Sequence, residues 1–198
     1  MTPAASPPIR LAQEPDADEL LSRSPLALLV GMVLDQQFPL ERAFAGPWVL
    51  AQRVGRELSA EEIAAYDPEE LVAVFAKPPV IHRFPSSMAA RVQQMCAHLV
   101  EHHGGDATSV WTGAKTGAEL LARVRALPGF GEQKAKIFVA LLGKQLGVRP
   151  RGWRVAAGIY GEDKSRRSVA DITGPESLLE VRAYKKSVKD ADKARARQ

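Results

Sequence analysis

Glycines alternate with other residues in the stretch Leu127-Pro128-Gly129-Phe130-Gly131-Glu132-Gln133-Lys134-Ala135. Amphipathic segments flank it, from residue 118 to 126 and from residue 132 to 146, with apolar residues at helical spacing. Glycine adopts a positive φ without a Cβ penalty and leaves neighbouring amides uncovered. The amides that begin the second helix are unpaired and lie at the positive end of its dipole, which favours an anion. The stretch predicts a helical hairpin that grips a phosphate, although ordinary helical hairpins share this pattern.

Composition sets wide bounds on what the protein does. The 198 residues include 45% hydrophobic and 25% charged residues, as in globular proteins, and a net charge of +4 permits an acidic polymer as partner. The single cysteine, Cys96, excludes an intramolecular disulfide and a zinc or iron–sulfur site built from cysteines alone. No apolar run reaches membrane-spanning length, and residues 1–15 lack a signal pattern. We therefore expect a soluble, cytoplasmic protein that does not engage a membrane.

A core helix precedes a short polar stretch early in the chain. Ser24-Pro25 is a typical helix start, and the apolar residues from 26 to 33 recur at helical spacing. Asp35-Gln36-Gln37 follows, just before a turn that contains proline, so we expect these polar residues at a surface or in a cleft. The next helix, residues 40–55, is predicted to be broken or kinked around Gly46-Pro47.

Further helix signals make the predicted fold all-α. Capping boxes occur at Ser59…Glu62 and Asp67…Glu70, and a last helix is expected from Pro175. No stretch alternates with period two long enough to predict a sheet. We expect two helical lobes and divide the chain into three parts. Residues 1–23 are expected to be an N-terminal segment that packs with the C-terminal lobe, and residues 24–146 a six-helix domain. Residues 147–198 are expected to be the C-terminal lobe, with a basic end that is mobile from Lys189.

Three motifs in this order carry a resemblance to a known family. Leu34-Asp35-Gln36-Gln37, His82-Arg83-Phe84-Pro85 and Leu127-Pro128-Gly129-Phe130-Gly131 resemble the HhH-GPD superfamily of base-excision DNA glycosylases over about residues 24–155. The chain is most similar to a small actinobacterial-type branch that lacks an iron–sulfur cluster. The resemblance implies a two-lobed helical fold and damaged double-stranded DNA as partner. We expect a monomer located in the cytoplasm, at the nucleoid if the source is bacterial.

The resemblance also implies roles for individual residues. In relatives the hairpin amides grip a phosphate, often with a bound monovalent cation, and a glutamine after the first core helix wedges into the duplex. Either Gln36 or Gln37 matches that wedge. The wedge offsets the stacking that is lost when the base flips out. DNA contacts are therefore expected from the glutamines, from the hairpin and from exposed arginines after it: Gln36, Gln37, Gly129, Phe130, Gly131, Gln133, Lys134, Arg149 and Arg151.

The chain departs from the family pattern in its chemistry. Relatives carry an essential aspartate after the hairpin helix, yet residues 148–155 contain no acid. Gln133 occupies the place of the lysine nucleophile of lyase relatives, and Lys134 lies about 100° further round the helix, so it should point elsewhere. No lyase activity is expected. Asp35 is the candidate catalytic carboxylate, unless backbone or arginine contacts satisfy it; Asp163 and Asp171 are second choices.

Other polar and aromatic residues have a functional and a structural interpretation. His82 either packs in the core or faces the cleft, and Phe130, Trp153 and Tyr160 either stack on a flipped base or belong to the core. The histidines at 98, 102 and 103 lack a third metal ligand, so no metal site is predicted and no cofactor beyond the monovalent cation is expected.

Two functions of different classes follow. The first is base excision repair by a monofunctional DNA glycosylase, which hydrolyses an N-glycosidic bond with Asp35 or another acid. The second is a non-catalytic protein that binds damaged DNA on a degenerate glycosylase scaffold, which the missing aspartate favours. A third, weaker possibility is a protein-interaction role in which the hairpin only packs. Release of a base separates the first from the second.

Overall fold

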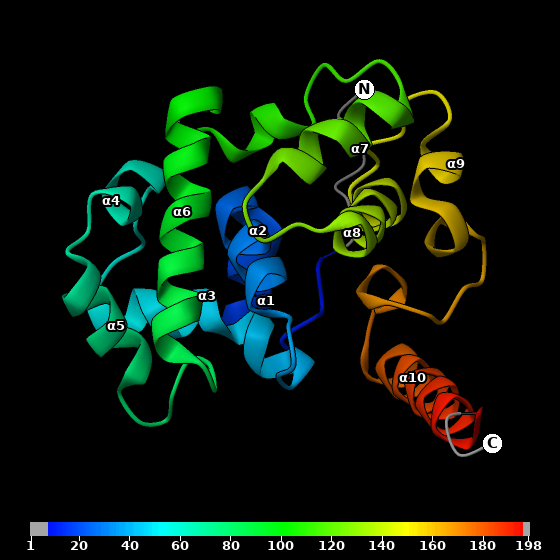
Figure 1. Cartoon of the computed structure of the whole chain (residues 1–198), viewed down its shortest axis with the longest axis horizontal. Coiled ribbons are helices and arrows are strands. Elements are labelled where there is room, and N and C mark those ends of the chain that lie inside the picture. The colour runs from blue at the N-terminus through cyan, green and yellow to red at the C-terminus, as the bar shows by residue number, and fades with distance from the viewer. Residues whose placement is uncertain (1–7, 196–198) are drawn as a thin grey trace.

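The computed structural model describes residues 8–195, and Figure 1 shows helices joined by short loops. The described part of the chain contains ten α-helices and three 3-10 helices, and no strand. An all-α fold is confirmed. The elements are α1 (Pro15–Arg23), α2 (Pro25–Leu34), α3 (Leu40–Val54), α4 (Ala60–Ala64), α5 (Pro68–Ala76), α6 (Pro85–His103), η1 (Ala107–Val110), α7 (Gly117–Ala126), α8 (Glu132–Gln145), α9 (Trp153–Ala157), η2 (Gly158–Gly161), η3 (Val169–Asp171) and α10 (Pro175–Arg195).

Helix α2 lies at the centre of the first lobe. Ser24 caps it, because the Ser24 hydroxyl accepts the Ala27 amide, and every residue from Ala27 to Leu34 is buried. Figure 1 places α4 and α5 on one side of α6 and α2 on the other. A helix that is apolar all round is stable only where neighbours cover each face. The burial of α2 fixes the position of its last residue and of Asp35 after it.

Helices α2 and α3 approach closely at two glycines. A Cβ added to Gly31 would lie 2.6 Å from the ring of Phe44, and one added to Gly46 would lie 2.5 Å from Leu34 Cδ1. The predicted break at Gly46-Pro47 is absent: α3 continues from Leu40 to Val54 with Pro47 inside it. Both residues are buried against neighbouring elements, and this packing offsets the hydrogen bond that proline removes.

The predicted helix caps are present. Ser59 and Glu62 exchange both bonds of a capping box at the start of α4. Asp67 accepts the amides of Glu69 and Glu70 at the start of α5, without the reciprocal bond of a full box. Each cap satisfies amides that the first helical turn leaves unpaired.

Helix α8 connects the hairpin to the C-terminal elements. It packs against α7 on one side and against α9, η2 and η3 on the other. Gly143 lies directly under the Trp153 ring, so a larger residue there would displace α9. Helix α8 thus contacts elements that precede residue 146 in the chain and elements that follow it. These contacts do not test the predicted boundary between residues 24–146 and 147–198, which stays a prediction.

The two ends of the chain are partly helical. Helix α1 packs against α2 and α3. The packing of residues 1–23 with the C-terminal lobe stays a prediction. Residues 1–7 lie outside the described range. The predicted mobile tail from Lys189 is helical as far as Arg195, because α10 continues that far. No helix within residues 8–195 is long and apolar enough to cross a membrane.

Candidate nucleic-acid interface

The hairpin turn joins α7 to α8 through two glycines with different roles. Gly129 has φ +89°, a left-handed conformation that favours glycine, and the Phe130 amide donates to the Leu127 carbonyl over 3.1 Å. Gly131 has φ −68° and ψ 173°, which any residue adopts, so the expectation of a positive φ holds only for Gly129. A Cβ at Gly131 would meet nothing within 4 Å. Gly131 therefore keeps the space in front of α8 open.

The first turn of α8 presents unpaired amides. Gly131 is the N-cap residue, so α8 has no side-chain cap, and within residues 8–195 no backbone acceptor meets the amides of Glu132, Gln133 and Lys134. These donors and the helix dipole face the open space left by Gly131, and together they favour an anion such as a phosphate.

Phe130 belongs to the interior of the hairpin. Its side chain is only 4% exposed, and its ring meets that of Phe138 edge-on with centroids 5.8 Å apart. Its amide is occupied by the bond to Leu127. The position of Phe130 therefore does not support the expected DNA contact, and the residue belongs to the core.

The end of α2 forms a tight turn beside the hairpin. Asp35 has φ −72° and ψ 71°, and the Gln36 amide donates to the Leu34 carbonyl over 2.7 Å, which is an inverse γ-turn. Gln36 and Gln37 are exposed, and Gln37 has φ +51°. The turn stops the helix and directs the three polar residues outward, as expected for a surface or cleft.

His82 and Arg91 hold this turn in place. His82 is buried, its Nδ1 accepts the Phe84 amide, and its Nε2 therefore donates to the Gln36 carbonyl over 3.1 Å. Burial lowers the pKa of His82, which keeps the ring neutral. Arg91 Nη1 donates to Gln36 Oε1 over 2.6 Å, and the Arg91 stem lies against Gly129. Sequence reasoning missed Arg91, since nothing in a polar position of α6 signals a contact with the hairpin.

Lys134 points toward the end of α2. Its Nζ donates to the Val33 carbonyl over 3.2 Å, and its side chain is partly buried. The position of Lys134 on the helix predicts an amine that points away from the place of the lyase nucleophile. In the structure the amine lies in the neighbourhood of Asp35. Burial lowers the pKa of Lys134 to about 8, and the nearby Asp35 carboxylate opposes that shift. An amine is thus present beside the candidate carboxylate.

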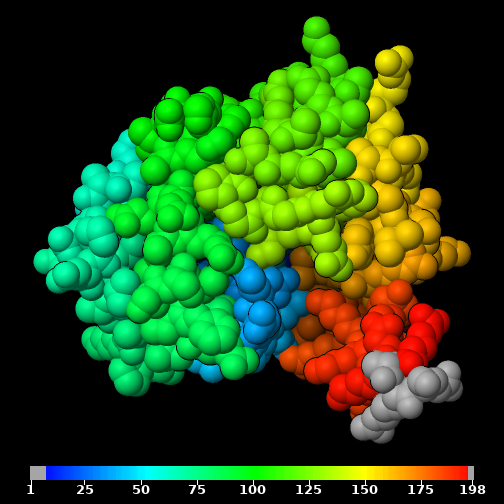
Figure 2. Space-filling model, viewed as in Figure 1, coloured from blue at the N-terminus to red at the C-terminus, as the bar shows by residue number. Residues whose placement is uncertain are grey.

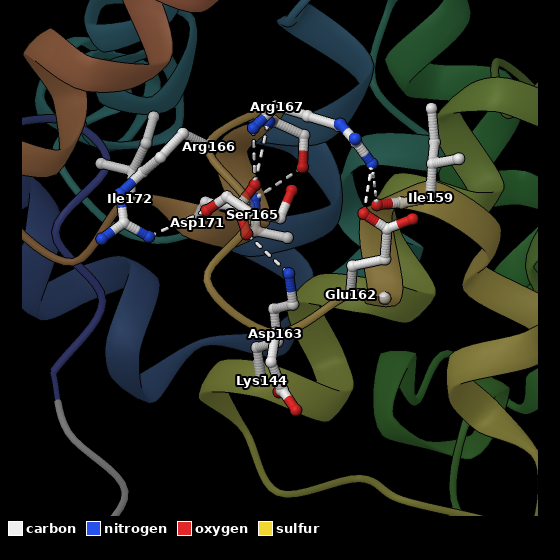
Figure 3. Close-up of polar contacts among 12 residues, drawn as sticks. Lys144, Ile159, Glu162, Asp163, Ser165, Arg166, Arg167, Asp171 and Ile172 are labelled. Carbon is white, nitrogen blue, oxygen red and sulfur yellow. Dashed lines mark hydrogen bonds and ion pairs between the residues drawn. The ribbon is translucent and has the colours of Figure 1, made fainter.

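The Asp35 carboxylate lies near two lysines but has no partner of its own. Within residues 8–195 it forms no side-chain hydrogen bond or ion pair, and burial raises its pKa, an effect opposed by the charges of Lys185 and Lys134. The second choices are engaged elsewhere. Asp163 pairs with Arg154 at 2.6 Å, and Asp171 pairs with Lys144 at 2.6 Å (Figure 3).

The predicted DNA contacts fall into two groups. The glutamines, the glycines and Lys134 gather where α2, α6 and the hairpin meet. Figure 2 shows the surface hollowed where the blue segment, the yellow-green hairpin and the orange-red α10 adjoin. Arg149 donates to the Gly143 carbonyl over 2.7 Å, and the Arg151 carbonyl accepts the Gly117 amide, both at the far end of α8. Gly143 lies about 18 Å from Gly131 along the helix, at 1.5 Å per residue.

The remaining candidates have structural positions. Trp153 is 8% exposed and covers Gly143. The rings of His98 and His102 lie 4.4 Å apart, and no group of three or more His, Cys, Asp or Glu in the described residues is placed to hold a metal ion. Cys96 is buried, which raises its pKa to about 12. Gln133 donates to the Tyr160 hydroxyl over 2.9 Å, and the two residues line one cleft.

Comparison with known proteins agrees with this geometry. The sequence model of the HhH-GPD superfamily base excision DNA repair protein matches residues 30–195, most of the chain. The chain belongs to the HhH-GPD superfamily. Members of this superfamily act in base excision DNA repair and bind DNA. The matched range includes the end of α2, the hairpin and α10. No curated protein and no solved structure matched the chain.

Proposed function

We propose that this HhH-GPD protein is a monofunctional DNA glycosylase, with Asp35 as its catalytic carboxylate and damaged double-stranded DNA as its substrate. One observation carries the proposal: Asp35 follows the end of α2, near enough to Lys134 and Lys185 for their charges to act on its pKa, and within the described residues its carboxylate forms no hydrogen bond or ion pair. A partly buried carboxylate that has no partner and whose pKa burial raises costs free energy, so the fold alone gives no reason to keep it.

The proposal gives a task to each part of the site. The amides of α8 hold a phosphate of the lesion-bearing strand, and Gln36 or Gln37 fills the gap that a flipped base leaves. Asp35 either stabilises the positive charge that develops on the sugar or takes a proton from the attacking water. His82 and Arg91 position Gln36, the first through its backbone and the second through its side chain.

The proposal also includes a bound cation, the oligomeric state and the location of the protein. A monovalent cation would be held by backbone carbonyls of the turn. The Leu127 carbonyl accepts one hydrogen bond and has a second lone pair for such an ion. The ion would add positive charge beside the phosphate. We propose that the protein acts as a monomer on DNA in the cytoplasm and uses no iron–sulfur cluster.

An excision assay tests the glycosylase proposal. Labelled duplexes that carry deaminated, oxidised or alkylated bases are incubated with the wild type, with Asp35→Asn and with Asp163→Asn, and abasic sites are revealed by alkali. Abasic product is expected from the wild type and from Asp163→Asn, with a loss of about a hundredfold or more for Asp35→Asn. Absence of abasic product from every lesion would contradict the proposal.

The position of Lys134 adds one arm to this assay. A lyase forms a Schiff base between an amine and the abasic sugar, and borohydride traps it. For a monofunctional enzyme we expect no trapped complex. A complex that forms with the wild type and with Lys136→Ala, but not with Lys134→Ala, would identify Lys134 as a nucleophile and the protein as a bifunctional enzyme. Lys136 is the matched control because it pairs with Glu132 at 2.8 Å on the surface.

A second candidate is the non-catalytic protein that binds damaged DNA. It is favoured by the segment from Val148 to Val155, which contains no acid where relatives have their aspartate. This function predicts salt-sensitive binding to abasic or mismatched duplexes without base release. Base release by the wild type together with its loss in Asp35→Asn would exclude it.

A further inference from the structure

A cleft beside α10 opens next to the hairpin. It has a volume of about 260 Å³, near the lower end of small-molecule sites, and we call it the α10 cleft. Residues from α8, η2, the loop before η3 and α10 line it: Gln133, Ile159, Tyr160, Arg167, Tyr184, Lys185 and Val188. Gln133 lies in the first turn of α8, and Lys185 of α10 carries a charge that acts on the pKa of Asp35. The cleft therefore lies between the start of α8 and α10, in the neighbourhood of Asp35.

The walls of the α10 cleft are apolar and aromatic, and the structure leaves them exposed. Ile159 is 53%, Val188 40% and Tyr184 37% exposed, although large apolar side chains are normally buried. Tyr160 is fixed by Gln133, whose amide donates to its hydroxyl over 2.9 Å. Tyr160 is partly buried, and the Arg167 guanidinium lies 6.0 Å from the centroid of the Tyr184 ring, over one of its faces. The aromatic surface that remains in the cleft suits a flat aromatic ligand, which stacks on it.

The polar groups of the cleft donate hydrogen bonds and carry positive charge. The Tyr160 oxygen accepts the Gln133 amide, so its own O–H remains to donate. Arg167 is held by the Ile159 carbonyl and by Glu162 (Figure 3), and that ion pair cancels its charge. Lys185 on α10 lines the cleft, and its charge opposes the rise in the pKa of Asp35. Its ammonium is the cation that the cleft presents to a ligand.

We propose that the α10 cleft receives the flipped-out base and selects neutral bases with carbonyl groups, of the uracil or thymine type, over positively charged alkylated bases. This inference rests on the proposed glycosylase function. Stacking on Tyr160 and Tyr184 holds the ring, and the donors Lys185 and Tyr160 face its carbonyl oxygens.

The chemistry of bond cleavage gives the reason for this selectivity. The C1′–N bond breaks and its electron pair goes to the base, while the oxygen of water bonds to C1′ and the water proton passes to Asp35. A neutral base leaves as an anion, which then takes up a proton from solvent. The negative charge develops on its carbonyl oxygens, where the Lys185 ammonium stabilises it. A cationic base leaves as a neutral molecule and is repelled by the same ammonium before cleavage.

Photo-crosslinking tests where the base lies without requiring turnover. A duplex with one 5-iodouracil opposite guanine is bound by the full chain and irradiated, and the crosslinked peptide is identified by mass spectrometry. The chain has three tyrosines, and Tyr66 lies outside the cleft, so it is an internal control. A crosslink at Tyr160 or Tyr184 supports the proposal. A crosslink confined to other residues, or a bound duplex without any crosslink, overturns it, whether or not the protein releases bases.

Leaving-group dependence tests the role of Lys185. Single-turnover rates are measured for uracil, for 5-fluorouracil, which is a better leaving group, and for 7-methylguanine, which is cationic. Lys185→Gln is expected to slow uracil release about tenfold or more, as for the loss of one charge-assisted hydrogen bond, and to slow 5-fluorouracil release less. The control Lys186→Gln should leave both rates unchanged. Equal losses for both bases, or faster release of 7-methylguanine than of uracil by the wild type, would overturn the proposal.

Discussion

Asp35 carries its charge where burial disfavours it. Its pKa is raised by burial, so the folded chain holds the Asp35 proton more tightly than the unfolded chain does. The ionised form therefore lowers stability at neutral pH, and the penalty disappears as the pH falls through the raised pKa. If the ionised form acts in cleavage, activity should fall over the same range, above the ordinary value for an aspartate.

The substitution Asp35→Asn separates function from structure at this position. Asparagine keeps the shape of the side chain and removes the buried charge, so we expect the variant to be at least as stable as the wild type at pH 7. The measurement is urea unfolding followed by circular dichroism. A loss of about 1–3 kcal/mol, the cost of an unsatisfied buried partner, would show that the carboxylate holds the end of α2 instead.

Lys134 contributes to the pH dependence of the free energy of unfolding with a sign opposite to that of Asp35. Its pKa is about 8 in the folded chain against 10.5 for an ordinary lysine, so between these values the unfolded chain binds the extra proton. The free energy of unfolding should therefore rise with pH from about 8 to 10 through this group. In Lys134→Met this contribution should be missing, whereas Lys136→Met should retain it.

The pH dependence of the free energy of unfolding must be compared between wild type and variant, because a second group also contributes to it in this pH range. Burial raises the pKa of Cys96 to about 12, so this thiol keeps its proton in the folded chain and lowers stability as the pH rises above 9, its ordinary value. The Cys96 effect is common to all variants and cancels in the difference. Identical slopes for wild type and Lys134→Met between pH 8 and 10 would contradict the assigned burial of the amine.

At the scale of elements, the two glycines of the hairpin should respond differently to the same change. Gly129→Ala places a Cβ at φ +89° and 3.1 Å from Arg91 Cδ, and should cost about 1–2 kcal/mol of stability. Gly131→Ala meets nothing within 4 Å and has an ordinary φ, so the fold should tolerate it. Its methyl group would nevertheless occupy the space where a phosphate approaches α8.

We therefore expect Gly131→Ala to keep its thermal midpoint and to bind abasic duplex roughly tenfold more weakly, the worth of about one hydrogen bond. Gly174→Ala, which also meets nothing within 4 Å, is the matched control and should bind normally. Fluorescence anisotropy with a labelled duplex measures both. Unchanged affinity in Gly131→Ala would mean that DNA does not approach the open face of the turn.

The elements that were predictable from sequence are those set by local chemistry. The hairpin, the Ser24 cap and the Ser59…Glu62 box depend on residues within a few positions of one another, and the structure contains each of them. The prediction of a break or kink at Gly46-Pro47 is wrong as to the break, because packing against Leu34 of α2 and against Ile81, both outside α3, compensates for proline. Local rules give no account of that compensation.

The site was predictable only in part for the same reason. Asp35 and the glutamines could be singled out, because polar residues that end an apolar helix are conspicuous. Their surroundings could not be derived: Lys134 lies 101 positions from Val33, and Arg91 lies 55 positions from Gln36. Neither spacing has a sequence signature. The rotation of the α8 helix relative to α2, which turns Lys134 inward, follows from tertiary packing alone.

For the whole molecule, surface ion pairs reduce the positive charge that DNA can meet. The formal net charge is +4, yet several arginines of the C-terminal part face acids, among them the pairs Arg154–Asp163, Arg166–Glu180, Arg167–Glu162 and Arg182–Glu41. The cations beside the hairpin are Arg91, Lys134 and Lys185, and the far end of α8 carries Arg149 and Arg151. Binding should therefore depend on a few local charges more than on the net charge.

The salt dependence of binding measures how far DNA extends over the molecule. Each strand carries one phosphate per 3.4 Å of duplex axis, so the roughly 18 Å between the turn and Gly143, taken along that axis, corresponds to about five phosphates. If one strand follows α8 this far, Arg151→Gln should reduce the slope of log K against log salt by about 0.9, the contribution of one neutralised phosphate. Arg154→Gln, whose arginine is already paired with Asp163, should leave the slope unchanged. An unchanged slope in Arg151→Gln would show that the duplex leaves the surface near the hairpin, and the DNA contacts would then be confined to the turn, the end of α2 and α10.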